Sequence, residues 1–187
     1  FNDSGNVIEK KWFKSDQGLE YRYTYKYDMN GNKIEENELN QDSTLNAKSI
    51  YKYDGDGNQT EYNWYKSNGE LMYKFTYKYD RKGNQIEQNC FNSKGKHMEK
   101  VTSVYDEKRN KIEVNWYNPD EVLMSKDTYK YDDNGNQVEY VLYNLETGTE
   151  NKYTCNYEYD KSMNWTKRIE FKNGEPVFIY VREIQYF

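Results

Sequence analysis

The stretch YKYDGDGNQTEYNWYKSNGELMYKFTYKYDRKGNQIE, residues 51–87, contains the phrase YKYDxxGN twice, starting at Tyr51 and again at Tyr77. This period of 26 residues indicates a repeat architecture in which each copy is one supersecondary unit. Counted from the aromatic residue of the YD pair, seven copies follow one another, and Tyr186 begins an eighth. The repeats start at Phe1, Tyr27, Tyr53, Tyr79, Tyr105, Tyr131 and Tyr159. Because they leave no space for a linker, we predict a single repeat domain over residues 1–187.

Each repeat opens with residues that favour a tight turn, for example Asp28, Gly31 and Asn32 in the second copy. Aspartate favours the first corner of a type I turn, where its carboxylate accepts local backbone N–H groups. Glycine favours the following left-handed position. Arg109 and Met163 replace this glycine in two repeats, and each should cost on the order of 1 kcal/mol there. The D-x-x-G-N phrase therefore predicts a hairpin turn, called the YD turn below.

A second turn signal lies about halfway along each repeat. It reads KSDQG at 14–18, KSNG at 66–69, NSKG at 92–95 and KNG at 172–174. In the fifth repeat it reads NPDE at 118–121, and Pro119 suits the first central position of a type I turn. Two turns in each repeat predict two strands in each repeat.

The residues between the turns alternate with the period of a β-strand. In LMYKFTYKY, residues 71–79, Leu71, Tyr73, Phe75, Tyr77 and Tyr79 fall on one side, and Met72 and the lysines fall on the other. The shorter run after each YD turn, such as QTEYNWY at 59–65, is rich in residues that suit a pleated surface. We therefore predict an all-β fold with about fourteen antiparallel strands in seven β-hairpin repeats, which form an extended, twisted or partly rolled single sheet.

The sequence leaves open which face of the sheet carries the isoleucine and tryptophan columns. If the glycine is a bulge, Ile34 faces away from the tyrosine stripe and Glu35 lies on the tyrosine side. If the loop has four residues, Ile34, Ile86 and the tryptophans join the tyrosines. A shift of one residue exchanges the two faces completely. We favour the second alternative because it brings Ile8, Trp12, Trp64 and Trp116 together with the tyrosines.

The composition limits the class of protein. Hydrophobic residues make up 35% of the chain and the mean hydropathy is −1.32, but aromatic residues reach 18%, which argues against disorder. The net charge is −5, with 27 basic and 32 acidic residues interspersed, so nucleic acid and anionic membrane surfaces are not expected partners. No apolar run approaches the roughly 20 residues that a membrane span needs. Cys90 and Cys155 occupy unlike positions in their repeats and should remain unpaired.

The repeats resemble the YD repeats of Rhs proteins, teneurins and the large insecticidal toxin complexes. The matching phrases are YKYDMNGN, YKYDGDGN, YKYDRKGN, SVYDEKRN, YKYDDNGN and YEYDKSMN, and together they cover essentially the whole chain. The resemblance implies a spiralling antiparallel sheet, which in that family forms a hollow shell around a cargo domain. The repeats here are longer than is usual for that family, too few for such a shell, and accompanied by no cargo or self-cleaving motif. The resemblance therefore does not imply encapsulation.

The two ends of the chain differ from the central repeats. The last repeat contains Val177, Phe178, Ile179, Val181 and Ile184, and this aliphatic composition predicts a C-terminal cap. The chain begins at Phe1 in the middle of the YxYD motif, without a visible targeting segment, so we expect that a preceding segment was removed. We expect the protein to be exported, either secreted or displayed on a bacterial surface.

No set of residues predicts catalysis, a cofactor or a metal site. His97 is the only histidine and lies in a polar setting beside a turn. A glycosidase needs a pair of carboxylates, which two members of a glutamate column would provide, but cross-strand pairing with lysines and tyrosine hydroxyls explains the column better. The column consists of Glu9, Glu35, Glu61, Glu87, Glu113 and Glu139. The phrase DGDGN at 54–58 resembles an EF-hand start, yet it lacks a third acidic ligand and a flanking helix.

The aromatic residues give the best indication of function. Rings on a single-layer sheet must cover one another, and those that remain exposed form a platform for a protein or a polysaccharide. The candidate binding residues are Trp12, Trp64, Trp116, Tyr62 and Tyr140. We therefore expect a non-enzymatic structural or protein-interaction module, and the alternative is a carbohydrate-binding module that uses the tryptophan column.

Overall fold

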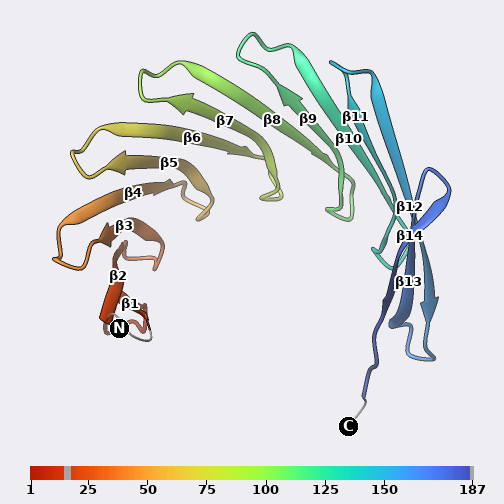
Figure 1. Ribbon diagram of the computed structural model, residues 1–187, viewed down its shortest axis with the longest axis horizontal. Coiled ribbons are helices and arrows are strands. Elements are labelled where there is room, and N and C mark those ends of the chain that lie inside the picture. The colour runs from red at the N-terminus through yellow and green to blue at the C-terminus, as the bar shows by residue number, and fades with distance from the viewer. Residues whose placement is uncertain (15–17, 186–187) are drawn as a thin grey trace. The chain divides into compact units, whose positions relative to one another are not determined.

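The computed structural model describes residues 1–14 and 18–185 of the chain. The described residues form fourteen strands and no helix, and the strands follow one another in sequence order in one sheet that is not closed (Figure 1). The strands are β1 (Glu9–Lys14), β2 (Gly18–Tyr27), β3 (Lys33–Leu39), β4 (Leu45–Tyr53), β5 (Gln59–Lys66), β6 (Leu71–Tyr79), β7 (Gln85–Asn92), β8 (His97–Tyr105), β9 (Lys111–Tyr117), β10 (Leu123–Tyr131), β11 (Gln137–Asn144), β12 (Thr149–Tyr159), β13 (Trp165–Lys172) and β14 (Glu175–Val181). The all-β antiparallel sheet predicted from the repeat is confirmed.

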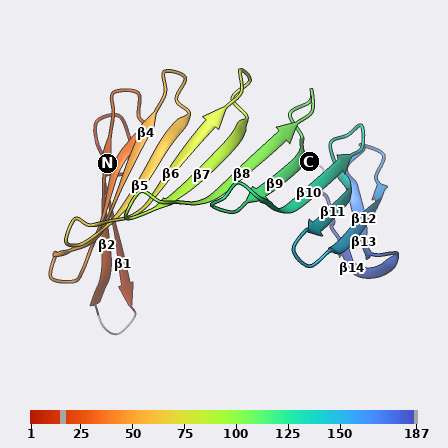
Figure 2. The same cartoon turned by 90° about the horizontal axis from the view of Figure 1, so that it is seen from above.

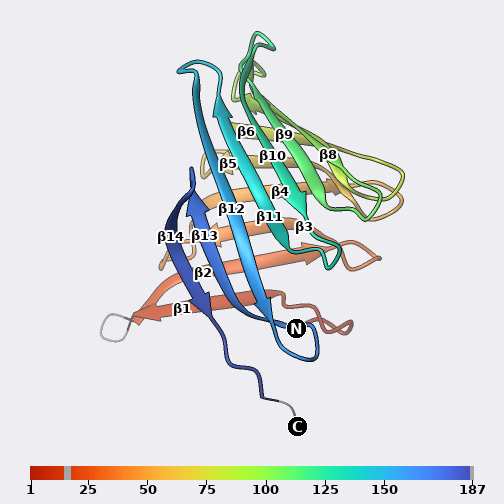
Figure 3. The same ribbon diagram turned by 90° about the vertical axis from the view of Figure 1, so that its right-hand side faces the viewer.

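Contacts divide the chain into two compact units, Phe1–Lys100 and Val101–Phe187, which are described separately below as the N-terminal and C-terminal units. In the N-terminal unit the YD turns lie along one edge of the strands and the second turns along the opposite edge (Figure 1). The strands of this unit fan out in Figure 2, as expected from the right-handed twist of β-sheets. In the C-terminal unit β11 to β14 lie side by side (Figure 3). The prediction of one repeat domain stays a prediction.

The YD turn has the geometry that its sequence predicts. In the third repeat, the Gly57 N–H donates to the Asp54 carbonyl at 3.2 Å, and the Asp54 N–H donates to the Asn58 carbonyl at 2.9 Å. Gly57 is left-handed, with φ of +83°. The Asp54 carboxylate accepts the N–H groups of Asp56 and Asn58 at 3.0 and 2.9 Å. The predicted role of the aspartate in this turn is therefore confirmed.

A register shift beside each turn determines which face each residue occupies. In β4–β5, Tyr53 pairs with Gln59 while Lys52 pairs with Glu61, so Thr60 is skipped. The corresponding residue Ile34 is skipped in β2–β3, where Glu35 pairs with Lys26. The loop therefore does not have four residues, and that expectation is wrong. The skipped residue nevertheless places the residues that follow it, among them Trp64, on the same face as the tyrosines, as the favoured four-residue alternative predicted.

Residues that are directly opposite in an antiparallel pair share a face, so the register defines two faces. In the N-terminal unit, Tyr51 is opposite Tyr62, and Ser49 is opposite Trp64. We call this side the tyrosine face. The other side is the lysine face, where Lys52 is opposite Glu61. The C-terminal unit has the same two faces, defined by Tyr129 opposite Tyr140 and by Lys130 opposite Glu139.

A second shift lies beside the other turn. Trp64 pairs with Tyr73 and Tyr65 pairs with Leu71, so Met72 is skipped. Leu71 therefore lies on the lysine face, and the prediction that it shares a face with Tyr73 is wrong because the alternation is interrupted at Met72.

The sheet has no buried core among the described residues. The buried hydrophobic residues are Ala47, Val114 and Cys155, and no described side chain is exposed by less than 2%. The described strands of each unit form a single layer, which explains this, because no other strands of the same unit cover either face. Stability must therefore come from backbone hydrogen bonds and from side chains that pack along each face.

Candidate functional site

The lysine face carries a ladder of glutamates held by lysines from neighbouring strands. The Glu61 carboxylate lies 2.8 Å from Lys52 Nζ and 2.8 Å from Lys74 Nζ, and it accepts a hydrogen bond from Asn63 at 2.7 Å. Glu35 is held in the same way by Lys26 at 2.9 Å and Lys48 at 3.0 Å. The cross-strand pairing of glutamate with lysine predicted from the sequence is confirmed.

Two repeats depart from this ladder in an informative way. Val104 stands where other repeats have a lysine, and Glu113 is held by Lys126 at 2.7 Å and by Asn115 at 2.7 Å. In the last repeat the signs are reversed, because Glu158 occupies the lysine position and contacts Lys167 at 2.8 Å. The reversed pair keeps opposite charges across the strands, so the sequence preserves the interaction rather than the residue type.

These glutamates are poorly suited to acid catalysis. Partial burial alone would raise the pKa of Glu61, but hydrogen bonds from Lys52, Lys74 and Asn63 outweigh it and lower the pKa to about 2. The pKa of Glu35 is lowered to about 2 for the same reasons. A general acid that works near neutral pH needs a raised pKa instead. The ladder is therefore suited to holding strands together.

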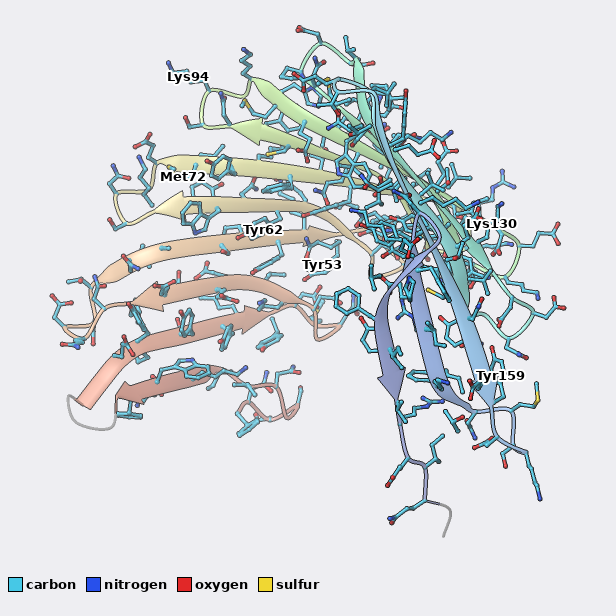
Figure 4. The ribbon with its side chains drawn as sticks, turned by 45° about the vertical axis from the view of Figure 1, so that its right-hand side comes forward. Tyr53, Tyr62, Met72, Lys94, Lys130 and Tyr159 are labelled. Carbon is cyan, nitrogen blue, oxygen red and sulfur yellow. The ribbon has the colours of Figure 1, made fainter. Side chains whose placement is uncertain are left out.

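Tyrosine hydroxyls connect successive YD turns. The Tyr53 hydroxyl, at the YD-turn end of β4 in Figure 4, donates to the Lys33 carbonyl of the preceding repeat at 2.9 Å. Tyr27, Tyr79 and Tyr131 make the same bond, at 2.8 to 2.9 Å, to the carbonyls of Val7, Gln59 and Lys111. The regular spacing of the YD tyrosine from repeat to repeat thus has a structural cause, since each of these four tyrosines binds one turn to the next.

Two equivalent tryptophan–tyrosine pairs lie on the tyrosine face of the N-terminal unit. Trp12 in β1 is opposite Tyr21, and Trp64 in β5 stacks on Tyr73 with ring centroids 6.2 Å apart and planes inclined by 6°. The exposed fractions are 61% for Trp12, 39% for Tyr21 and 41% for Tyr73. The pairs are four strands apart, about 19 Å at roughly 4.8 Å per strand. The tyrosines were missed as candidates, although each is the cross-strand partner of a predicted tryptophan.

Tyr62 is half-buried within the tyrosine face and is less available for binding than the tryptophan pairs. Its ring lies 5.2 Å from that of Tyr51 and 5.9 Å from that of Phe75, and its hydroxyl is 3.2 Å from Ser49 Oγ. Figure 4 shows Tyr62 on β5. It also shows the two edges of the N-terminal unit, marked by Tyr53 beside a YD turn and by Lys94 in a second turn at the opposite edge. The structure therefore confirms that the rings cover one another.

The other two predicted residues lie in the C-terminal unit. Trp116 in β9 is half-buried and opposite Ser125 on the tyrosine face. Tyr140 stacks on Tyr153 with centroids 4.4 Å apart, and its hydroxyl donates to Glu170 Oε1 at 2.9 Å. The predicted face of Trp64 and Trp116 is confirmed.

A carboxylate at one position of the tyrosine face breaks the repeat pattern. Asp127 stands where other repeats have Tyr23, Ser49, Phe75 and Cys155, and it is opposite Val114. Burial raises the pKa of the Asp127 carboxyl, and Tyr129 donates to it at 3.3 Å. Burial, followed by the charge of Asp127, raises the pKa of Tyr129 to about 12. The sequence could have indicated this residue, because Asp127 is charged whereas the residues at the equivalent position of the other repeats named above are uncharged.

The remaining candidates are the histidine and the two cysteines. His97 is half-buried against the ring of Phe91, with ring centroids 5.4 Å apart. Cys90 and Cys155 are free thiols, of which Cys155 is buried. Within residues 1–14 and 18–185, no group of three or more histidine, cysteine, aspartate or glutamate side chains is placed to hold a metal ion.

Shallow grooves recur on the lysine face beside the second turns of the N-terminal unit. One, of about 510 Å³, includes Leu45, Lys48 and Tyr65 in its lining. The next, of about 290 Å³, includes the equivalent residues 26 positions later, among them Leu71, Lys74 and Phe91. The register shift at Met72 creates this apolar column, which alternation alone does not predict.

The comparisons with known proteins concern the fold alone. No protein-family model matches the chain, and no curated protein matches it. Among solved structures, the chain is similar to a porin-like protein from Bacteroides uniformis ATCC 8492, with a TM-score of 0.52, 12% identity, and coverage of 96% of this chain and 85% of that one. It also resembles TcdB2-TccC3 with a TM-score of 0.45 and 14% identity over 95% of this chain, and it spans 12% of that chain's length.

The register and turns thus define a β-repeat module built from seven antiparallel hairpins in the described residues. No helix in the described part of the chain is long and apolar enough to cross a membrane.

Proposed function

We propose that the chain is a non-enzymatic module of a secreted or cell-surface protein and that its tyrosine face binds another protein. The observation that carries this proposal is the exposure of Trp12, Tyr21 and Tyr73 on one face of a sheet that no second layer covers. Aromatic residues are enriched in protein interfaces because they bury a large area with few rotatable bonds. The resemblance of the phrase to YD repeats supports an exported, modular protein.

Site-specific photo-crosslinking tests the binding face. A photoreactive phenylalanine analogue at position 12 reports on the tyrosine face, and the same analogue at Tyr65, opposite Lys48, reports on the lysine face. We expect position 12 to form protease-sensitive adducts with extracellular proteins of the source organism, and position 65 to form far fewer. Equal labelling from both positions, or none from position 12, would contradict the proposal.

The second candidate is a carbohydrate-binding module that uses the Trp12, Trp64 and Trp116 column. It is favoured by the two equivalent Trp–Tyr pairs, because flat rings at a regular spacing suit a polymer of stacked sugars. Titration of tryptophan fluorescence with soluble polysaccharides separates the two candidates. Saturable quenching that Trp64→Ala removes and Tyr65→Ala retains would favour the sugar, whereas no quenching by any polysaccharide would favour the protein partner.

The non-enzymatic part of the proposal is tested with chromogenic glycosides. Asp127 is the carboxylate to follow, because burial raises its pKa. We expect no hydrolysis above the buffer rate for the parent chain. Hydrolysis that Asp127→Asn abolishes would make the chain an enzyme and overturn this part of the proposal.

The proposed location is tested on intact cells of the source organism. An antibody raised against the chain should label intact cells or should detect the chain in the culture medium. Labelling only after permeabilisation would contradict export.

A further inference from the structure

The lysine face of the N-terminal unit carries more cations than carboxylates. Three glutamates on this face each contact two basic side chains. These sets are Glu9 with Lys11 and Arg22, Glu35 with Lys26 and Lys48, and Glu61 with Lys52 and Lys74. Each set leaves one positive charge uncompensated. The face is therefore basic, although residues 1–100 contain equal numbers of acidic and basic residues.

Burial increases this asymmetry between cations and carboxylates. The side chains of Lys26, Lys52 and Lys78 are between 62% and 67% exposed, whereas the glutamates that they contact are between 14% and 19% exposed. These lysines recur at every second strand, about 10 Å apart at roughly 4.8 Å per strand. The face thus presents a regular row of ammonium groups to the solvent, with the carboxylates shielded beneath them.

The two apolar grooves of this face lie among the cations. The larger groove places Lys48 beside Leu45, Ile50 and Tyr65. The smaller groove repeats the arrangement 26 residues later, with a lysine beside a leucine and an aromatic ring. Because a lysine stem covers apolar surface while its ammonium group stays in water, each groove has an apolar wall and a cationic rim. A ligand that fits both parts has an anionic head and an apolar body.

The charge spacing distinguishes between the classes of anionic partner. Double-stranded DNA carries one charge per roughly 1.7 Å of its axis, far denser than one uncompensated cation every second strand. Highly charged polymers also offer little apolar surface to the grooves. Lipids diffuse within a membrane, so anionic headgroups can gather at the lysines, and basic residues combined with aromatic rings are typical of membrane interfaces. The net charge of −5 predicted no such partner because it averages over both faces and both units.

We propose that the lysine face of the N-terminal unit docks on an anionic lipid surface. The row formed by Lys26, Lys52 and Lys78 contacts the headgroups, and the apolar parts of the lipids enter the grooves beside Lys48 and Lys74. The docking is peripheral and reversible, because each lysine near an anionic surface contributes only about fivefold to binding. The inference does not depend on protein binding by the tyrosine face. Lipid adducts at position 65 are not protease-sensitive, so the photo-crosslinking comparison of the two faces is unaffected.

Co-sedimentation with vesicles tests the docking. We expect the full chain to bind vesicles of phosphatidylcholine mixed with an equal amount of phosphatidylglycerol, and not vesicles of phosphatidylcholine alone. Binding should weaken as sodium chloride is raised, because salt screens exposed charges. The triple variant Lys26→Gln, Lys52→Gln and Lys78→Gln should bind about a hundredfold more weakly, since each lysine contributes about fivefold. Glu35 and Glu61 keep their second lysine in this variant.

The matched control removes three lysines outside this face, by Lys10→Gln on the tyrosine face and by Lys108→Gln and Lys161→Gln in YD turns of the C-terminal unit. It should weaken binding less than about fivefold. Equal weakening by the two triple variants would show that binding follows net charge, and it would overturn the proposal. A parent chain that binds single-stranded DNA or an acidic polysaccharide but not the anionic vesicles would also overturn it.

A fluorescent label keeps the test decisive if the triple variant does not fold. With Cys90 and Cys155 replaced by serine, a nitrobenzoxadiazole label on Thr76→Cys reports on the smaller groove, and the same label on Tyr73→Cys reports on the tyrosine face of the same strand. We expect anionic vesicles to shift the emission at position 76 to shorter wavelength and to leave position 73 unchanged. Equal shifts at both positions, or no shift at position 76, would contradict docking by the lysine face.

Discussion

Left-handed residues in the YD turns carry a measurable conformational cost. Met163 occupies the glycine position with φ of +62° and is 62% exposed. We expect Met163→Gly to stabilise the chain by about 1 kcal/mol, because glycine adopts this conformation without the steric penalty. Urea unfolding followed by circular dichroism measures the change. The converse control, Gly83→Ala at φ of +78°, should destabilise by a similar amount, and a neutral Met163→Gly would contradict the account.

His97 is the residue that fits its repeat position least well. Its buried Nε2 has no hydrogen-bond partner within the described part of the chain, and other repeats place Leu45, Leu71 and Leu123 at this position. We expect His97→Leu to stabilise the chain by roughly 1 kcal/mol, because it removes an unsatisfied buried polar atom. The neighbouring exposed control Met98→Leu should have little effect in the same urea assay. Loss of stability in His97→Leu would show that Nε2 has an unrecognised partner.

At this scale, the sequence predicted the turns well and the environments of single side chains poorly. Asp28, Gly31 and Asn32 determine a local conformation by themselves, so the turn followed from residue type. The half-buried setting of His97 depends on Phe91 in the adjacent strand. To predict this burial, one must know the strand register beside the second turn, and the residue types alone do not determine that register.

Between strands, the charge-reversed pair Glu158–Lys167 tests whether the ladder stabilises the sheet. Glu158→Lys alone sets two lysines opposite each other, and Lys167→Glu alone sets two glutamates opposite each other. Each should destabilise by a few tenths to about 1 kcal/mol, and the double variant should recover most of the loss. A double-mutant cycle in urea measures the coupling. Additive losses in the double variant would mean that the pair contributes nothing.

The ladder also predicts how stability depends on pH. The pKa of Glu61 is lowered from 4.5 to about 2 in the folded chain, so between these values the unfolded chain binds more protons. The stabilisation from this group is therefore complete above about pH 4.5 and is lost as the pH falls towards 2. We expect the urea midpoint of the parent to fall over this range and that of Glu61→Gln to fall less. Identical slopes would contradict the assigned pKa.

At the element scale, periodicity predicted the strands but not the bulges beside them. The skipped residues include Ile34, Thr60 and Met72, which share no turn chemistry. The register shifts allow the turn to fit the twist of the paired strands. The residue types at the skipped positions do not predict where such a shift occurs. For this reason the sequence predicted the correct face for Trp64 although the predicted loop length was wrong.

For the whole molecule, the 26-residue period predicted the strand number and order because each repeat is joined only to its sequence neighbours. The last repeat was predicted to be a C-terminal cap, and this stays a prediction; the side chains of residues 177–181 in β14 are exposed. Composition identified the strand as unusual and could not tell whether its rings and aliphatic groups would be covered. The proposed binding by the tyrosine face likewise involves a partner whose identity the sequence of this chain does not encode.

Deletion of one repeat tests the central claim most directly. Removing residues 53–78 deletes one full period of 26 residues, joins Lys52 to Tyr79, and places Lys52 opposite Glu87 in the role of Lys78. Removing residues 53–77 instead leaves one extra residue and moves the preceding strand onto the wrong face. Urea unfolding of both variants should show a cooperative, β-sheet chain for the first and a clearly lower midpoint for the second. Equal midpoints for the two deletions would contradict a sheet built from hairpins in a fixed register.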